Sequence, residues 1–469
     1  MTQRRAAWLC AIFAVSLVAA RAEAQSPAPR TVGDEINIIR WREDYSFLRD
    51  RTDPTLLERL KFIPLNDAKT DFLTLGGELR ERVESYDHAF FGLPGGRSFT
   101  AFATRVLADA DLHLGERFRA FAELGSFYES GRKPVERPFD RGDLELQQGF
   151  LDFAAVHAAS ERLTFRVGRQ EFPLGSGRLV AIRDSTNARL AFDAAKIEWI
   201  GGRNTVTAFA GRPVVSKRGA FESASSDRES FWALDWSVAG ATVRQPNAEL
   251  FYLGRHLRTT AFAEATASET RHTLGGRMWA RPAPWDCSLQ ASYQFGTFGD
   301  ALIRAWGVAS DTGYSIASLP TRPRLALRAD IASGDSKAHD GVLQTFEAPY
   351  PALNYFTEAA IFAPGNGYDF HPYLQLQPTR TISAEIGVAF LWRLRKADAV
   401  YRAGGGVLVP PGTSDARFVT GMFQVDLTWK PIPFLSLQGA LVRAPAGQLV
   451  REAGGKSTTF GLLSTDLRL

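Results

Sequence analysis

Cysteine is almost absent from this chain of 469 residues, which contains only Cys10 and Cys287. Cys10 lies in an N-terminal segment that we expect to be removed, so the mature chain would keep a single thiol. One thiol excludes an intramolecular disulfide and also a zinc site built on thiolates. The fold must therefore be stable without covalent crosslinks.

Long apolar runs and a strong charge of one sign are also missing. Beyond residue 24 no uninterrupted apolar run reaches the about 18 residues that a membrane-spanning helix needs. Lys and Arg number 55 and Asp and Glu 51, a balance that argues against nucleic acid as the main partner. Only nine of the basic residues are lysines, a skew toward arginine that a GC-rich genome or a function would produce. The hydrophobic content of 45% excludes a disordered chain.

The N-terminus has the pattern of a secretory signal. Arg4 and Arg5 form a basic start, and 6–20 is an apolar stretch. An A-x-A cleavage site follows at 22–24, so we expect residues 1–24 to be removed and the mature chain to begin at Gln25. The protein should therefore leave the cytoplasm.

From about residue 73 to the end, apolar and polar residues alternate with period 2. Successive side chains of a strand point to opposite faces, so each such segment has one apolar and one polar face. In 285–295 the apolar face comprises Trp285, Cys287, Leu289, Ala291, Tyr293 and Phe295. The opposite face comprises Asp286, Ser288, Gln290, Ser292 and Gln294.

Alternation alone would also fit a soluble sandwich, but three features favour a membrane barrel. The segments run for about 10–16 residues, whereas soluble strands average about 5–6. They continue for nearly 400 residues without a convincing amphipathic helix, and aromatic residues recur at their ends. We therefore predict an all-β fold: one transmembrane antiparallel barrel over 73–469, of 16–18 strands with 18 favoured, around an aqueous lumen. Residues 25–72 lack this pattern and are interpreted as a short periplasmic or plug-like lead-in with helical turns.

The strands are expected near 73–86, 99–114, 116–130, 144–158, 161–172, 188–200, 203–211, 229–240, 247–266 (one strand or two), 271–281, 285–296, 301–309, 323–333, 379–396, 417–430, 433–444 and 456–469. Short connections, as at 114–116 and 431–433, are interpreted as periplasmic turns. Longer ones at 131–143, 173–187, 212–228, 334–378 and 397–416 are interpreted as extracellular loops. The segment 334–378 could fold into the barrel.

Arginines on the polar strand faces are the candidate pore-lining residues. Fixed positive charge in a wet pore concentrates anions, and a guanidinium group binds a carboxylate through two parallel hydrogen bonds. An arginine facing lipid at mid-depth would cost about 2–4 kcal/mol, which favours placement in the lumen. The candidates are Arg80, Arg82, Arg105, Arg119, Arg166, Arg169, Arg178, Arg189, Arg277, Arg328 and Arg393.

The alternative for each of these arginines is a structural one, in which it pairs with a carboxylate across strands and braces the wall. The densest block comprises Arg169, Glu171, Arg178, Arg183, Arg189 and Asp193. It would either line a constriction or form a salt-bridge network that holds a loop, and we favour the network.

Catalytic and metal-binding motifs are not found. Gly175-Ser176-Gly177 is not the G-x-S-x-G of a nucleophile elbow, and the seven histidines form no H-E-x-x-H. The loop 335–341 has a loose likeness to a calcium loop but fails the EF-hand pattern. We therefore expect no enzyme activity, no cofactor and no protein-bound metal.

Several stretches together resemble the alginate export family of outer-membrane barrels. They are RWREDYS at 40–46, KFIPL at 61–65, LGGELRER at 75–82, GRQE at 168–171, GRLV at 177–180, RLAFD at 189–193, ASGD at 332–335 and the block 371–393. The resemblance covers almost the whole mature chain, in order. It implies an outer-membrane location and lumen arginines that guide a polyuronate, a role carried over only to Arg80, Arg82 and Arg169.

The leading hypothesis is a passive outer-membrane channel for an anionic, alginate-like polysaccharide or oligosaccharide. Within transport, the alternative is a general or small-anion nutrient porin. An outer-membrane lipase or deacylase and a closed structural barrel are the hypotheses of other classes. Expected partners are the anionic solute, outer-membrane lipid and lipopolysaccharide, with a periplasmic export partner if the channel exports. We expect a monomer, and the sequence does not set the direction of transport.

Overall fold

The computed structural model describes residues 30–134, 137–242 and 244–469. Val32–Leu469 form one compact unit, and the fold described here is that of this unit. The signal segment predicted at 1–24 lies outside the described residues.

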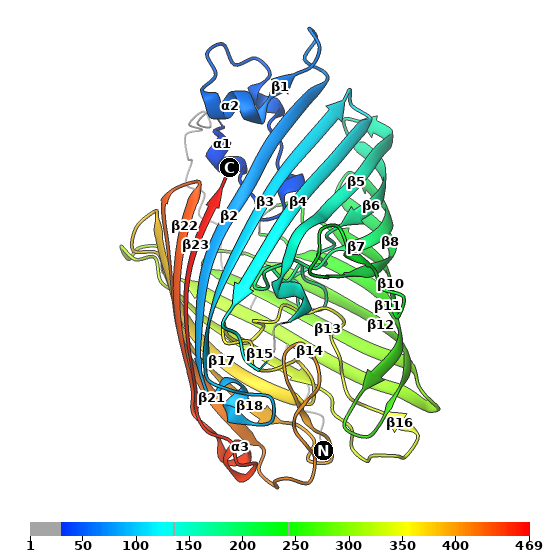
Figure 1. Ribbon diagram of the computed structural model, residues 1–469, viewed down its shortest axis with the longest axis vertical. Helices are drawn as coiled ribbons and strands as arrows, with labels where there is room; N and C mark the ends of the chain where they lie inside the picture. Colours follow the sequence, from blue (N-terminus) through cyan, green and yellow to red (C-terminus); the bar gives the residue numbers. More distant parts are fainter. Residues whose placement is uncertain (1–29, 135–136, 243) are drawn as a thin grey trace, which may run out of the picture. The chain divides into compact units, whose positions relative to one another are not determined.

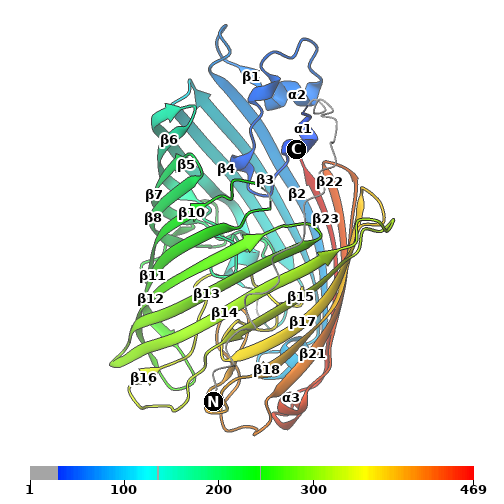
Figure 2. The same ribbon diagram turned by 180° about the vertical axis from the view of Figure 1, so that it is seen from behind.

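Eighteen long antiparallel strands form a closed barrel (Figures 1 and 2), which confirms the predicted fold and the favoured strand number. Each strand pairs with the next along the barrel, and β23 closes it by pairing with β2. The strands are β2 (Phe72–Asp87), β3 (Phe99–Leu114), β4 (Phe118–Ser130), β5 (Gly142–Ala158), β6 (Glu161–Gln170), β7 (Phe192–Gly201), β8 (Asn204–Val215), β10 (Glu229–Val238), β11 (Asn247–Ala261), β12 (Thr266–Ala280), β13 (Trp285–Phe298), β14 (Ala301–Ser315), β15 (Arg324–Ala332), β17 (Gly367–Leu376), β18 (Ile382–Arg393), β21 (Phe418–Ile432), β22 (Leu435–Ala444) and β23 (Thr458–Arg468).

The remaining elements are short. The helices are α1 (Val32–Glu35), η1 (Arg40–Arg42), η2 (Ser46–Leu48), α2 (Leu56–Lys61), η3 (Ala89–Gly92), η4 (Pro138–Asp140) and α3 (Gln448–Glu452). The short strands are β1 (Ile63–Pro64), β9 (Ala224–Ser225), β16 (Val342–Leu343), β19 (Val400–Tyr401) and β20 (Val407–Val409). In the described part of the chain, no helix has the length and apolar character needed to cross a membrane.

Burial in the barrel is inverted relative to a water-soluble protein. On β13, Leu289 and Tyr293 are 55% and 49% exposed, whereas Gln290 and Gln294 on the opposite face are 6% and 0% exposed. A strand side chain that is apolar and exposed is stable only against lipid, because water would favour the reverse arrangement. The apolar faces therefore point to the membrane and the polar faces to the interior of the barrel.

One strand was missed. The segment 334–378 was expected to be a single loop, but its last part forms β17, which pairs with β15 and β18. Proline within a run argues against a strand because it has no N–H to donate, and Pro372 hid the alternation. The ladder between β17 and β18 is interrupted at His371 and Pro372, and resumes at Tyr373 opposite Gly387. The expected segment 247–266 holds one strand, β11, and the first residue of β12.

The two ends of the barrel differ in their connections. Short turns, such as the one at Gly115, gather at the end that also carries α2 and the C-terminus (Figure 1). Short turns mark the periplasmic side of outer-membrane barrels, and long loops the extracellular side. The lead-in packs at the turn end: the Arg40 guanidinium lies 3.2 Å from Asp109, and the Arg166 guanidinium lies 4.2 Å from the ring centroid of Trp41.

Candidate functional site

The loop 171–191, between β6 and β7, contacts the inner wall of the barrel. The side-chain amide of Asn187 donates to the carbonyl oxygens of Thr104 and Tyr128 at 3.0 Å. The Arg80 guanidinium donates to the carbonyl oxygens of Asp184 at 2.6 Å and of Thr186 at 2.7 Å. The loop is therefore tied to β2, β3 and β4 through both its backbone and its side chains.

A buried salt-bridge network holds the same loop. The Glu78 carboxylate on β2 lies 2.5 Å from Arg105 and 2.8 Å from Arg189, and all three side chains are fully buried. Asp184 lies 2.7 Å from both arginines. Burial raises the pKa of Asp184, but these guanidinium groups outweigh it and hold that pKa well below its ordinary value. Arg105 and Arg189 are thus engaged by carboxylates from the wall and the loop.

Glu171 is the first residue of loop 171–191, and its carboxylate is the least well hydrogen-bonded in this network. Both of its carboxylate oxygens are buried without a hydrogen-bond partner among the described residues, and its nearest cation, Arg189, is 3.8 Å away. Burial raises the pKa of Glu171 to about 8, opposed by Arg189 and reinforced by Glu123. This carboxyl group is therefore poised to change its protonation state near neutral pH.

A second inward loop, 333–366, lies between β15 and β17 and packs against the opposite wall. The Gln294 amide donates to the carbonyl oxygen of Glu347 at 2.7 Å, and Arg271 donates to that of Thr345 at 3.0 Å. The Tyr350 hydroxyl donates to Glu229 at 2.6 Å. The sequence left open whether this loop folds inward, and these contacts with β10, β12 and β13 show that it does.

The two inward loops are joined to each other inside the barrel. The Ala181 N–H donates to the Tyr350 carbonyl oxygen, and the Tyr350 N–H donates to the Leu179 carbonyl oxygen, both at 2.8 Å. Around this link lies an aromatic cluster with ring-centroid distances from 4.0 to 6.3 Å, comprising Phe172, Phe192, Phe209, Phe231 and Tyr350. The two loops therefore form a packed junction inside the barrel, against β7, β8 and β10.

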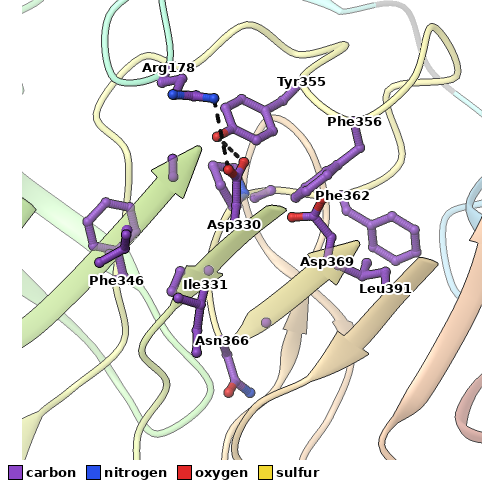
Figure 3. A pocket seen from close by; sticks show the side chains of 18 of the residues that line it. Arg178, Asp330, Ile331, Phe346, Tyr355, Phe356, Phe362, Asn366, Asp369 and Leu391 are labelled. Atoms are coloured by element: carbon purple, nitrogen blue, oxygen red, sulfur yellow. Dashed lines mark hydrogen bonds and ion pairs between the residues drawn. The ribbon is translucent and has the colours of Figure 1, made fainter. Parts of the chain in front are cut away.

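Three cavities follow one another along the lumen. A wide cavity of about 840 Å³ lies toward the turn end, and one of about 260 Å³ lies against Tyr350 and Gly404–Gly406. Between them is a smaller chamber of about 50 Å³, which shares Arg178 and Tyr355 with the first and Phe346 with the second (Figure 3). A chamber of this size holds roughly three or four waters. A sugar ring would require the inward loops to move.

Most of the predicted pore-lining arginines are closely held. Besides Arg80, Arg105 and Arg189, the ion pairs are Arg82–Glu84 at 2.8 Å, Arg119–Asp111 at 2.6 Å, Arg166–Asp152 at 2.7 Å, Arg169–Asp193 at 2.8 Å and Arg277–Glu249 at 2.8 Å. Arg393 donates to the carbonyl oxygen of Ser414 at 2.6 Å. These contacts have the geometry of the structural alternative, in which arginine braces the wall or a loop.

Arg178 and Arg328 are held more loosely. Arg178 lies 4.0 Å from Asp330, and its Nη1 is buried with no partner among the described residues. Arg328 lies 3.5 Å from Asp311 and donates to the Tyr355 carbonyl oxygen at 3.4 Å. Both arginines line the 840 Å³ cavity. Of the predicted block at 169–193, Arg169 and Asp193 pair with each other, whereas Arg178 reaches β15.

Two aromatic residues that line this cavity were not among the predicted pore-lining residues. Trp279 lines it from β12, and its ring centroid lies 3.9 Å from the Arg277 guanidinium. Its position on the same strand face as Arg277 could have revealed it. Tyr373 lies on β17, which was expected to be loop, so its inward direction was hidden. Within the described ranges, no three His, Cys, Asp or Glu side chains group in a way that could hold a metal ion.

Comparison with known proteins gives a family and a set of similar folds. The family model described as alginate export matches residues 71–462. Among solved structures, OccK11 (OpdR) of Pseudomonas aeruginosa has 13% identity and a TM-score of 0.52, covering 85% of this chain and 96% of that one. OccAB1 of Acinetobacter baumannii has 10% identity and a TM-score of 0.57, covering 88% and 99%. OccK2 (OpdF) of P. aeruginosa, solved with glucuronate, has 11% identity and a TM-score of 0.53, covering 87% and 98%.

These structural likenesses concern the fold, because all three identities are low. No curated protein sequence matches the chain. The family match, in contrast, spans most of the sequence and includes six of the eight motifs that resemble the family. The chain therefore belongs to the alginate export family, and it is a β-barrel channel of the outer membrane.

Proposed function

We propose that this channel lets anionic saccharides cross the outer membrane passively. The observation that carries the proposal is the charge of the 840 Å³ cavity. Its lining includes five arginines and two aspartates, namely Arg178, Arg277, Arg281, Arg324, Arg328, Asp286 and Asp311. Excess positive charge in a confined, water-filled space raises the local concentration of anions and repels cations.

The family and one similar structure support an acidic sugar as the solute. The alginate export description names a polyuronate as the family's cargo, and OccK2 was solved with glucuronate, a sugar carboxylate. Arginine suits such a cargo because its planar fork matches a carboxylate through two hydrogen bonds. We also propose that the barrel has no catalytic role, since its lumen carboxylates are largely engaged by arginines, as in Arg166–Asp152.

A small-anion porin is the second candidate, favoured by one observation. The 50 Å³ chamber between the two larger cavities has room for water and small ions but not for a sugar ring. In the saccharide proposal, the inward loops must therefore separate during transport.

Flux into proteoliposomes separates the two candidates. Vesicles with the full barrel are given a uronic-acid trisaccharide or a neutral glucose trisaccharide of the same length. We expect the acidic trisaccharide to enter at least about tenfold faster. Equal entry of the two would overturn the saccharide proposal, and chloride flux without entry of either would favour the small-anion porin.

A further inference from the structure

We propose that the 840 Å³ cavity contains a subsite for one ring of an acidic sugar, in which Arg178 and Arg328 bind the carboxylate and Trp279 packs against the ring. This inference rests on the proposed function and deepens it, because it places a specific site on one wall of the lumen. The subsite lies on the turn side of the chamber in Figure 3 and is built from β12 to β15 and loop 171–191.

The cationic half of the subsite comes from two different parts of the chain. Arg178 lies on the inward loop and Arg328 on β15, and both are placed around Tyr355 and Asp330. The Tyr355 hydroxyl donates to Asp330 at 2.6 Å, so this carboxylate is already engaged (Figure 3). Contacts of 3.4 Å and longer leave the two guanidinium groups incompletely bonded, and a bidentate carboxylate would complete them.

The aromatic half stands on the same rung of the barrel as Arg328. Trp279 pairs with Ser288, Ser288 with Asp311, and Asp311 with Arg328 across four adjacent strands. Three strand spacings place the two ends of this rung about 14 Å apart at their Cα atoms. The side chains of Trp279 and Arg328 both line the 840 Å³ cavity, at the two ends of this rung. The Arg277 guanidinium lies over one face of the indole ring, 3.9 Å from its centroid, so the sugar ring would pack on the other face.

Between these ends lies an unsatisfied hydroxyl. Ser288 Oγ is buried without a hydrogen-bond partner in the described structure, although its residue lines the cavity. Buried polar groups are nearly always paired, so this hydroxyl is available to a water or to a sugar hydroxyl in the cavity. A sugar hydroxyl supplies both a donor and an acceptor. Asp311 would not repel the ligand strongly, because it is held by Arg324 at 2.8 Å and by the Tyr373 hydroxyl.

This subsite should bind the carboxylate of a pyranose more tightly than it binds a simple anion. It offers an aromatic ring, a hydroxyl partner and two incompletely bonded guanidinium groups. The apolar face of a sugar ring packs on an aromatic side chain, whereas chloride gains nothing from Trp279. The occupant would be a free uronate or one residue of a longer acidic chain.

Isothermal titration calorimetry of the full barrel in detergent tests the subsite without requiring conduction. The probes are glucuronate, glucose and a galacturonate trisaccharide. We expect glucuronate to bind and glucose not to bind. The double variant R178Q/R328Q should weaken glucuronate binding by about tenfold or more, and W279A by a smaller factor. R328K should retain part of the affinity, since it keeps the charge and loses the fork.

Matched controls are R380Q, which removes an exposed arginine of the β17–β18 turn, and W236F on the lipid-facing side. Neither should change glucuronate binding. A trisaccharide that binds more tightly than glucuronate would identify a polymer segment as the occupant, and equal affinity would identify a free uronate. Absence of glucuronate binding, or unchanged binding in R178Q/R328Q and W279A, would overturn the subsite. The proposed function fails separately, by equal flux of acidic and neutral trisaccharides.

Discussion

The backbone of Tyr350 is hydrogen-bonded to that of Leu179 at 2.8 Å, although the two residues belong to loops that enter the barrel from opposite walls. The reciprocal bond, from Ala181 N–H to the Tyr350 carbonyl oxygen, has the same length. Together with the surrounding phenylalanines, this link joins the two loops inside the barrel. We expect the conductance of the channel to depend on whether the two loops stay together.

Breaking the link between the loops should raise conductance. Y350P removes the N–H that donates to Leu179, so the loops should separate more often. We expect single-channel conductance or open probability in planar bilayers to rise by at least about twofold. Y350F keeps both backbone bonds and removes only the hydroxyl that binds Glu229, so its effect should be smaller. Identical conductance in Y350P and the native barrel would contradict a gating role for this link.

The salt-bridge network around Glu78 should protect loop 171–191 from proteolysis. E78Q removes the carboxylate that Arg105 and Arg189 share, and loss of one partner of a buried ion pair costs about 3–5 kcal/mol. Trypsin should therefore cut after Arg178, Arg183 or Arg189 at least about tenfold faster in E78Q. The control is E81Q, on the exposed face of the same strand. Equal cleavage rates in the two variants would show that the network does not secure the loop.

The closure of loop 171–191 should weaken as pH rises. The folded-state pKa of Glu171 is about 8, above its ordinary value near 4.5, so the folded loop binds this proton more tightly than the opened loop does. The contribution of Glu171 to the closure of the loop is therefore full below about pH 4.5, and it is lost as pH rises toward 8. Hydrogen exchange of loop peptides should become faster between pH 5 and pH 9, after correction for intrinsic exchange. The neutral variant E171Q should lose most of this dependence, and an unchanged profile would assign it to another group.

Arginine on the outer face of the barrel should be poorly tolerated. Leu289 is 55% exposed on β13 and faces lipid, so L289R should destabilise the barrel by about 2–4 kcal/mol. Urea unfolding in lipid vesicles measures this change. L319R, at an exposed position in the β14–β15 turn, should cost much less. Equal stability of the two variants would contradict the assignment of the apolar faces to the membrane.

Alternation along the sequence was sufficient to predict the barrel wall. In 285–295 every apolar residue before Phe295 is followed by a polar one, so the two faces of the strand are clearly distinct. The observed strand β13 begins at the expected Trp285. Alternation did not predict β17, because Pro372 interrupts both the period-2 pattern of the sequence and the hydrogen-bond ladder to β18. A period-2 pattern reports which way a side chain points, and it fails where the backbone itself departs from regular pairing.

The candidate site was only partly predictable for a different reason. The strand pattern correctly placed the Arg105 side chain on the inner face, but its partner Asp184 is 79 residues away in a loop. Whether an arginine braces the wall or faces water depends on such long-range contacts, which local patterns do not contain. Arg178 shows the same limit, since its position beside Asp330 requires the inward fold of loop 171–191.

The reversal potential of the open channel tests the central claim most directly. In a planar bilayer with a tenfold gradient of KCl, an arginine-dominated lumen should favour chloride over potassium, and R178Q/R328Q should shift the reversal potential toward zero. R380Q, on the exposed turn, should leave it unchanged. A native channel that favours potassium, or one that shows no selectivity, would contradict an anion-conducting, arginine-bearing lumen.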